Sequence, residues 1–333
     1  MTANKGFSHR VAAVRLAAVL GLGLGLLAAP AAYAQAWPDK PVRIVVPYPA
    51  GAVGDVVMRI VGERLSAKWG QQFVIDNRPG GGGMAASRFV ADAAPDGYTL
   101  LLNGPNHVTN LGLYKQVPYD PIADFTPITH VASSQTMLVA HSSTGFRNVE
   151  QIVAAAKSKP GAMNYASSGS GTGTHLSMEM LMRATGTKLT HVSYKGGSPA
   201  AVALAAGEVQ VGFSSVPLMQ ALIDTGRLVP ILVGGNKRLI AYPKVPSLGE
   251  LGMLNYDVEV WFGLFGPKGT PPAVVEKLSA EIHAMLAEPA VAQRLEKIGF
   301  TAVGSTPAEF DTLVRKERQR WPELIRELGI QGS

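Results

Sequence analysis

The stretch that most constrains the fold is GAMNYASSGSGTGTH, residues 161–175. A short apolar run ends at Ala166, and Ser167–Thr174 then contains only serine, glycine and threonine. A helical pattern of apolar residues begins after His175. This order predicts a strand, a tight loop and a helix N-terminus, whose free backbone N–H groups and small hydroxyls favour an anion.

A second turn of the same kind lies far upstream, in YPAGAVGD at residues 48–55. It follows the β-branched run Val42–Val46 and precedes another helical pattern. We expect Asp55 to act as the N-cap of that helix, because an aspartate there accepts N–H bonds from the first turn. Two uncharged anion-binding turns so distant in the chain predict a site assembled between two domains.

The residues expected at this site come from both turns and from a third loop. Asn103 and Asn106 follow the strand predicted at residues 98–102, on the same side of the sheet. The full set of candidate ligand-binding residues is Tyr48, Ala50, Gly51, Ala52, Asn103, Asn106, Ser167, Ser168, Gly169, Ser170, Gly171, Thr172, Thr174, His175 and Phe213.

Strands and helices alternate along the chain. Strands are expected at residues 42–46, 73–75, 98–102, 136–140, 191–194, 209–213 and 228–233. Residues 259–265 are apolar and aromatic, and two helices are expected to close the chain, at about 272–287 and 307–328. Such alternation predicts an α/β protein with mostly parallel sheets flanked by helices. Pro322 is expected to kink the last helix or to begin a new one.

The first 34 residues have the features of a secretory signal peptide. Lys5, Arg10 and Arg15 precede an apolar segment from Leu16 to Ala29, and Ala32-Tyr33-Ala34 is a small-residue cleavage site. We therefore predict a periplasmic protein that begins at Gln35 after cleavage. The chain has no cysteine, which excludes disulfides, a thiol nucleophile and a lipid anchor on cysteine.

Charge and motif content exclude several functional classes. Removing the three basic residues before Gln35 leaves 27 Lys and Arg against 24 Asp and Glu, so no basic surface for nucleic acid is expected. None of the 7 histidines has the spacing of a zinc site, and we expect neither metal nor cofactor. A monomer is expected.

Three interpretations of Ser167–Thr174 stay open at this point: a nucleotide loop, a bare structural turn and a small-anion site. A phosphate loop of the Walker type requires a Gly-Lys-Ser/Thr ending, whereas Gly173 is followed by Thr174 and His175. A secreted hydrolase that uses Ser168 or Ser170 is the alternative from another class, although no base partner is evident. A third possible function of the whole protein is a sensory module that binds a partner protein and no longer binds a transported solute.

Uncharged groups are sufficient to hold an anion. A hydrogen bond to a charged group contributes about 1.5–3 kcal/mol and a helix N-terminus about 0.3–1 kcal/mol. Four or five such bonds reach the roughly 8 kcal/mol of a micromolar complex, before ordering costs.

Several stretches together resemble a known family. They are WPDKPVRIVVP at 37–47, DNRPG at 76–80, APDGYTL at 94–100, YDPIADF at 119–125, YKGG at 194–197 and PKGTP at 267–271. In this order, behind a signal peptide, they are similar to the periplasmic solute-binding proteins of tripartite tricarboxylate transporters, the Bug family.

The resemblance implies a two-lobed flytrap fold with two crossovers. Lobe 1 maps to residues 36–136 plus 262–333 and lobe 2 to 137–261. It also implies capture of a small carboxylate between the lobes, through backbone groups of the two turns, and delivery to membrane transporter subunits or to a sensor.

Two positions depart from the family pattern. The first turn carries Gly54 where the family commonly has a hydroxyl residue, and Gln210 stands where an aspartate is frequent. We therefore expect the ligand specificity of this protein to differ from the family pattern because of these two residues. Replacing Gly171 with aspartate is expected to abolish binding without affecting folding.

Overall fold

The computed structural model describes residues 37–333, apart from 236, 253–259, 299, 328 and 331–333. The signal peptide predicted at residues 1–34 lies outside the described residues. Contacts divide the chain into two units, Met1–Asp39 and Lys40–Ser333, and every element below belongs to the second. Among the described residues, no helix combines the length and apolar character that a bilayer crossing requires.

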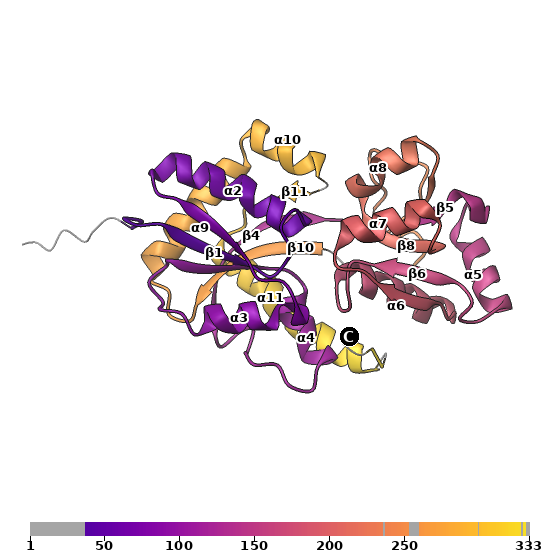
Figure 1. The fold of residues 1–333 in the computed structure, drawn as a ribbon, viewed down its shortest axis with the longest axis horizontal. Helices are drawn as coiled ribbons and strands as arrows, with labels where there is room; N and C mark the ends of the chain where they lie inside the picture. Colours follow the sequence, from indigo (N-terminus) through magenta and orange to yellow (C-terminus); the bar gives the residue numbers. More distant parts are fainter. Residues whose placement is uncertain (1–36, 236, 253–259, 299, 328, 331–333) are drawn as a thin grey trace, which may run out of the picture. The chain divides into compact units, whose positions relative to one another are not determined.

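The first sheet has six strands in the order β11-β4-β10-β3-β1-β2 (Figure 1). Their bounds are β1 Val42–Val46, β2 Phe73–Asn77, β3 Thr99–Asn103, β4 Phe125–Ser134, β10 Val260–Pro267 and β11 Thr301–Ala302. β1 pairs in parallel with β2 and β3, whereas β10 runs antiparallel to both β3 and β4.

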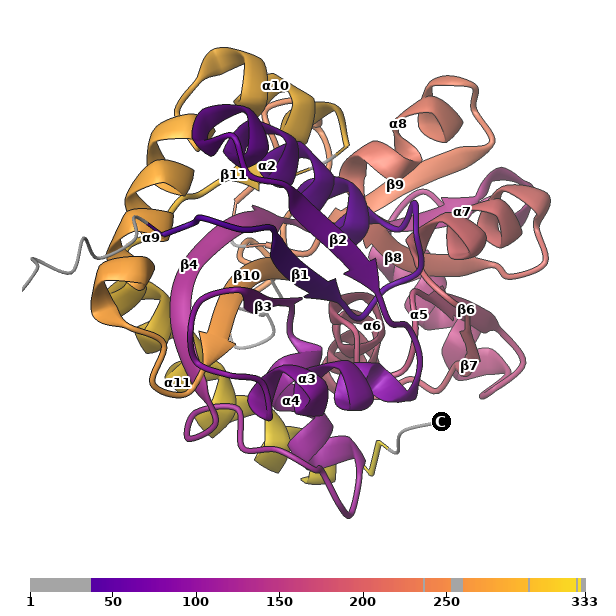
Figure 2. The same ribbon diagram turned by 60° about the vertical axis from the view of Figure 1, so that its left-hand side comes forward.

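Helices cover both faces of this sheet, as Figures 1 and 2 show from two directions. One face carries α3 (Met84–Ala91), α4 (Asn106–Leu113) and α11 (Pro307–Glu327), and the other carries α2 (Val53–Trp69), α9 (Pro272–Leu286) and α10 (Pro289–Lys297). A short 3-10 turn, η1 (Gly81–Gly83), leads into α3. α11 continues through Pro322 as one helix, and α10 is a helix that the sequence pattern did not predict.

The second sheet has five strands in the order β7-β6-β8-β5-β9. They are β5 Thr136–His141, β6 Asn164–Ser167, β7 Thr190–Ser193, β8 Val211–Ser215 and β9 Leu228–Val233. α5 (Val149–Ser158) and α6 (Gly173–Thr185) lie on one side, and α7 (Gly197–Ala206) and α8 (Val216–Asp224) on the other (Figure 1). The turn η2 (Ser142–Thr144) precedes α5.

Alternation along β5 builds both cores of the second sheet. Leu138 and Ala140 are buried in the cluster formed with α5 and α6, whereas Met137 and Val139 are buried in the cluster formed with α7 and α8. This is the period of two that places successive side chains on opposite faces.

The α/β class is confirmed, but both sheets are mixed rather than mostly parallel. Only Gln135 separates β4 from β5, so the chain passes directly from the first sheet into the second. The strands that carry the chain between the sheets, β4, β5, β9 and β10, pair antiparallel with their neighbours.

The core of the first sheet contains a buried carboxyl group. Glu317 on α11 is 9 % exposed and accepts a hydrogen bond of 2.5 Å from Trp321 Nε1. Burial raises the pKa of Glu317 above its ordinary value of 4.5, and the bond from Trp321 and the charge of Arg320 only partly oppose this. Folding is therefore favoured by protonation of Glu317.

We predict that Glu317→Gln stabilises the protein at pH 8 and that the gain disappears on acidification. The raised pKa means that the wild-type contribution is fully present below about pH 4.5 and is lost as the pH rises through the folded-state pKa. Chemical denaturation between pH 4 and 8 measures this. The control is Glu309→Gln on the same helix, because bonds from Thr306 lower the pKa of Glu309. A gain at Glu317 that does not change with pH contradicts the prediction.

Candidate ligand-binding site

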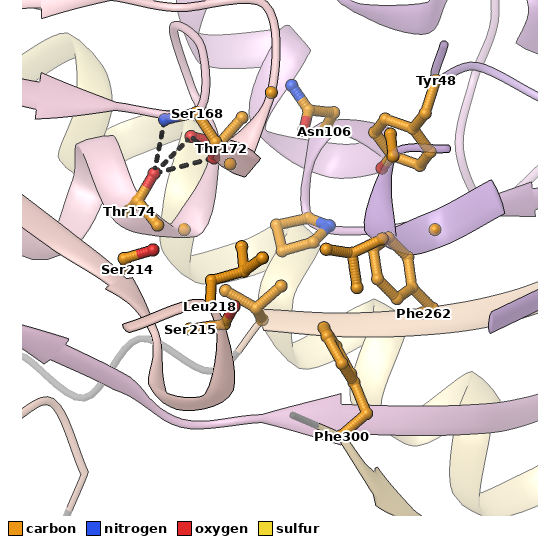
Figure 3. A pocket seen from close by; sticks show the side chains of 18 residues that line it. Tyr48, Asn106, Ser168, Thr172, Thr174, Ser214, Ser215, Leu218, Phe262 and Phe300 are labelled. Carbon is orange, nitrogen blue, oxygen red and sulfur yellow. Dashed lines mark hydrogen bonds between the residues drawn. The ribbon is translucent and has the colours of Figure 1, made fainter. Parts of the chain in front are cut away.

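The loop after β6 is held by its own hydroxyl groups. Ser168 Oγ lies 3.1 Å from Thr172 Oγ1 and 2.8 Å from Thr174 Oγ1, and Ser168 N–H donates to Thr174 Oγ1 at 2.9 Å (Figure 3). Thr172 is the N-cap residue of α6, although its side chain makes no capping bond. The hydroxyl triad Ser168, Thr172 and Thr174 therefore lies at the helix N-terminus, where the first N–H groups have no partner within the helix.

His175 fixes the same loop through a hydrogen bond to its backbone. Its Nδ1 accepts the Gly171 N–H at 3.0 Å, and its Nε2 lies 3.6 Å from Glu179 Oε1. The ring is 3 % exposed. The Gly171 N–H thus donates to His175. This bond gives His175 a structural role in the loop, as an alternative to the ligand contact expected from the sequence.

The half-buried His191 on β7 packs against His175 and meets the buried Ser167 on β6. The His191 ring stacks on that of His175 with centroids 4.0 Å apart, and His191 Nε2 lies 2.6 Å from Ser167 Oγ. Burial, and then the nearby His175, lower the pKa of His191 to about 4. Burial raises the pKa of Glu179, but the bonds from His175 and Tyr165 outweigh it and the pKa falls below its ordinary value.

The turn after β1 is held by a carboxylate. α2 begins at Val53 and its N-cap is Ala52, so Asp55 is not the N-cap that the sequence suggested. Its Oδ2 accepts the N–H of Gly51 at 2.8 Å and Arg59 Nε at 2.9 Å, and its Oδ1 accepts Asn77 Nδ2 at 2.9 Å. Burial raises the pKa of Asp55, but these bonds outweigh it and the pKa is lowered. Asp55 reaches backward because it is already inside the first helical turn.

A cavity of about 100 Å³ lies where the two turns meet (Figure 3). Its lining includes the first residues of α2, α4, α6, α7 and α8, represented by Val53, Asn106, Gly173, Gly197 and Leu218. Several helix N-termini directed at one space favour negative charge there. A second cavity of about 490 Å³ adjoins the first and shares with it Tyr48, Ala52, Asn106, Ser168, Thr172 and Gly196.

Nine of the fifteen candidate residues line these cavities. They are Tyr48, Ala52, Asn103, Asn106, Ser168, Gly169, Ser170, Thr172 and Thr174. Neither lining includes Ala50, Gly51, Ser167, Gly171, His175 or Phe213. Phe213 is 1 % exposed and packs in the core with α5 and α6, because β8 alternates and the next residue, Ser214, faces the cavity.

The sequence analysis missed several lining residues. Ser214 and Ser215 end β8, and Gly196 and Gly197 follow β7, so the pattern of small residues after a strand would have found them. Ser215 Oγ is buried and has no hydrogen-bond partner. Phe262 and Phe300 carry no such signal, because they come from distant parts of the chain.

The two departures from the family pattern differ in their consequences. Gly54 lines the cavity, and a Cβ there would lie 2.7 Å and 2.9 Å from ring carbons of Tyr48 and 3.0 Å from Phe262. Gln210 immediately precedes β8, and its side chain accepts the Asn164 N–H at 2.8 Å. The cavity is at the other end of that strand, so Gln210 does not line it.

Gly171 is a poor position for testing the site. Its φ is +74° and a Cβ there would overlap the Leu113 side chain. An aspartate at 171 therefore disturbs packing as well as charge, contrary to the expectation that folding is unaffected.

Charged side chains are almost absent from the walls. None of the residues described as lining the first cavity is charged, and Lys195 is the charged one among those lining the second. Within the described parts of the chain, no group of three His, Cys, Asp or Glu side chains is placed to hold a metal ion. Hydrogen-bond donors and helix dipoles therefore dominate the potential of the site.

Comparison with known proteins identifies the family. Residues 57–330 match the model of the tripartite tricarboxylate transporter family receptor. The chain belongs to this receptor family. A protein of Pseudomonas sp. (strain P51), encoded in the tcbD-tcbE intergenic region, is 37 % identical over 300 residues, which covers 90 % of this chain and 89 % of the relative.

Solved structures agree with this assignment. The receptor matches R. palustris Rpa4515 with adipate at a TM-score of 0.82 and 33 % identity, covering 89 % of this chain and 100 % of that one. It matches the periplasmic binding protein BugD at a TM-score of 0.80 and 30 % identity, covering 89 % and 100 %. The periplasmic-binding-protein fold expected from the sequence is confirmed.

The receptor is a solute-binding protein and not an enzyme. The hydrolase alternative relied on Ser168 or Ser170. Among the described residues, Ser167 Oγ lies 2.6 Å from His191 Nε2 and Ser143 Oγ lies 2.7 Å from His141 Nδ1, but neither serine lines a cavity, and Ser167 is fully buried. A nucleophile needs access to its substrate, which Ser167 lacks.

We predict that Gly54→Ala lowers the free energy of unfolding by about 1–3 kcal/mol, because the added methyl group overlaps the Tyr48 ring. The control is Gly62→Ala on the same helix, where the nearest atoms lie at ordinary distances of 3.5–3.6 Å. That change should be neutral or stabilise by about 0.5–1 kcal/mol. Denaturant titration measures both, and in a Tyr48→Ala background the cost at Gly54 should shrink. An unchanged cost there would exclude the overlap with Tyr48 as the cause.

Proposed function

We propose that this receptor captures a small carboxylate in the cavity between the loops after β1 and β6. The observation that carries the proposal is the convergence of several helix N-termini and the hydroxyl triad on a cavity whose described lining has no charged residue. The fold match to a relative described with adipate supports a carboxylate as the anion.

The binding mechanism uses neutral donors. The hydroxyls of Ser168, Thr172 and Thr174 bond one another, and each can rotate to donate to a carboxylate oxygen. The first N–H groups of α2 and α6 are directed along their helix axes toward the same space. His175 already fixes the loop after β6 and Asp55 the turn after β1, so little ordering has to occur when the anion binds.

We further propose that the two sheets belong to two lobes, 36–136 plus 262–333 and 137–261. A ligand that contacts both lobes stabilises their closed arrangement by its differential affinity for it. We place the receptor in the periplasm, with residues 1–34 as its cleaved leader, and its partners are the membrane subunits of a tripartite tricarboxylate transporter.

We predict that Thr174→Val weakens carboxylate binding at least about tenfold, because it removes a hydroxyl that both lines the cavity and holds the Ser168 N–H. Thr174→Ser should restore the affinity. The control is Thr185→Val at the other end of α6, where the hydroxyl bonds Leu181 O at 2.7 Å.

The measurement is calorimetry with a panel of mono-, di- and tricarboxylates, preceded by a thermal-shift screen. A protein that no carboxylate in the panel stabilises, but that a sugar or a cation does, would falsify the proposed function. Equal affinities in the valine variants at 174 and 185 would exclude the hydroxyl triad from the site.

A further inference from the structure

The first cavity has two walls of opposite chemistry. The hydroxyl triad lies on one side, and Tyr48, Phe262 and Phe300 lie on the other, with Leu218 between them (Figure 3). Val260, at the beginning of β10, adds to the apolar side. A ligand held by its carboxylate at the hydroxyl triad therefore meets hydrocarbon at its other end.

The aromatic wall is a packed surface. The rings of Tyr48 and Phe262 meet edge to face with centroids 5.5 Å apart, and those of Phe262 and Phe300 lie 5.3 Å apart. Phe262 and Phe300 are 6 % and 2 % exposed. Burial raises the pKa of Tyr48 far above its ordinary value of 10.0, so this hydroxyl stays neutral and supplies no cation or anion to the wall.

Leu218 closes the space between the two walls. It lies in the first turns of α8, and the Cβ of any residue replacing Gly197 would approach Leu218 Cδ1 to 2.8 Å. The beginning of α7 therefore packs against Leu218. A small polar residue at this position would open the wall to water.

The rings of Phe262 and Phe300 and the side chain of Leu218 offer a second carboxylate no hydrogen bond. An ionised group moved from water against hydrocarbon loses its hydration, and no cation lines this cavity within the described residues. Lys195 lines the adjoining cavity, but it is exposed, and a charge pair in water is weak.

We propose that the receptor selects carboxylates whose far end is an apolar alkyl or aryl group over those that carry a second carboxylate there. The proposal rests on the proposed function, because it assigns the substrate class of the same cavity. The specificity-determining residue is Leu218, with Phe262 and Phe300 as its supports.

Matched acids test this directly. Hexanoate and adipate share one carboxylate and a six-carbon chain and differ only at the far end, and butanoate with succinate and 4-methylbenzoate with terephthalate form equivalent pairs. Calorimetry of the protein with all six should show the apolar-ended acid binding at least about tenfold more tightly in each pair that binds.

Two variants locate the effect. Leu218→Ser should weaken the apolar-ended acid about tenfold and narrow its advantage within each pair, because part of the hydrocarbon contact is lost. Leu222→Ser, one turn further on α8, is the control, because Leu222 lines an outer groove and not this cavity. Thermal unfolding of both variants corrects for any loss of folded protein.

The outcomes separate the two proposals. Tighter binding of the dicarboxylate, with its advantage abolished by Lys195→Ala, overturns the selectivity and leaves carboxylate capture intact. An equal response of Leu218→Ser and Leu222→Ser also overturns it. Absence of binding by every acid of the panel contradicts carboxylate capture itself, and the selectivity with it.

Discussion

The site depends on hydrogen bonds that fix two loops before any ligand arrives. Gly171 N–H donates to His175 and Gly51 N–H donates to Asp55, in turns that belong to different sheets. Each bond uses a buried or half-buried side chain to hold a backbone that otherwise has many conformations. Because these bonds lie behind the cavity, the N–H groups and hydroxyls in front of them are already oriented. Little conformational entropy is therefore lost when a ligand binds.

The carboxylates near the cavity are each paired with a group of the protein itself. Asp55 is paired with Arg59, and Glu179 lies against His175, so each carboxylate has its partner on the side away from the cavity. An unpaired carboxylate at either position would repel an anionic ligand. Internal pairing leaves the helix N-termini as the main source of potential at the site, which is positive and short in range.

Local sequence predicted the loops but not their long-range contacts. Ser167–Thr174 and the turn at residues 48–55 were recognisable because small residues after a strand have few alternatives to a tight turn. The roles of His175 and Gly54 depend on Glu179 and on the Tyr48 ring, whose positions follow from the folded chain. Side-chain direction misled the analysis at Phe213, since one step along a strand reverses the face.

The mixed sheets and the apolar wall could not be predicted from the sequence, because they too depend on contacts between distant parts of the chain. The single residue between β4 and β5 carries the chain from one sheet to the other, but only the folded arrangement shows that β10 returns beside β4 and antiparallel to it. That return brings Val260 and Phe262 to the cavity, next to Phe300 from the loop before β11. In the proposed binding mode, affinity and selectivity therefore have separate origins in the chain: helix N-termini near β1 and β6 hold the anion, and the returning strand supplies the surface that meets the remainder of the ligand. Under this proposal, changes in that surface are expected to alter which acid is preferred while the anion-binding loops keep their hydrogen bonds.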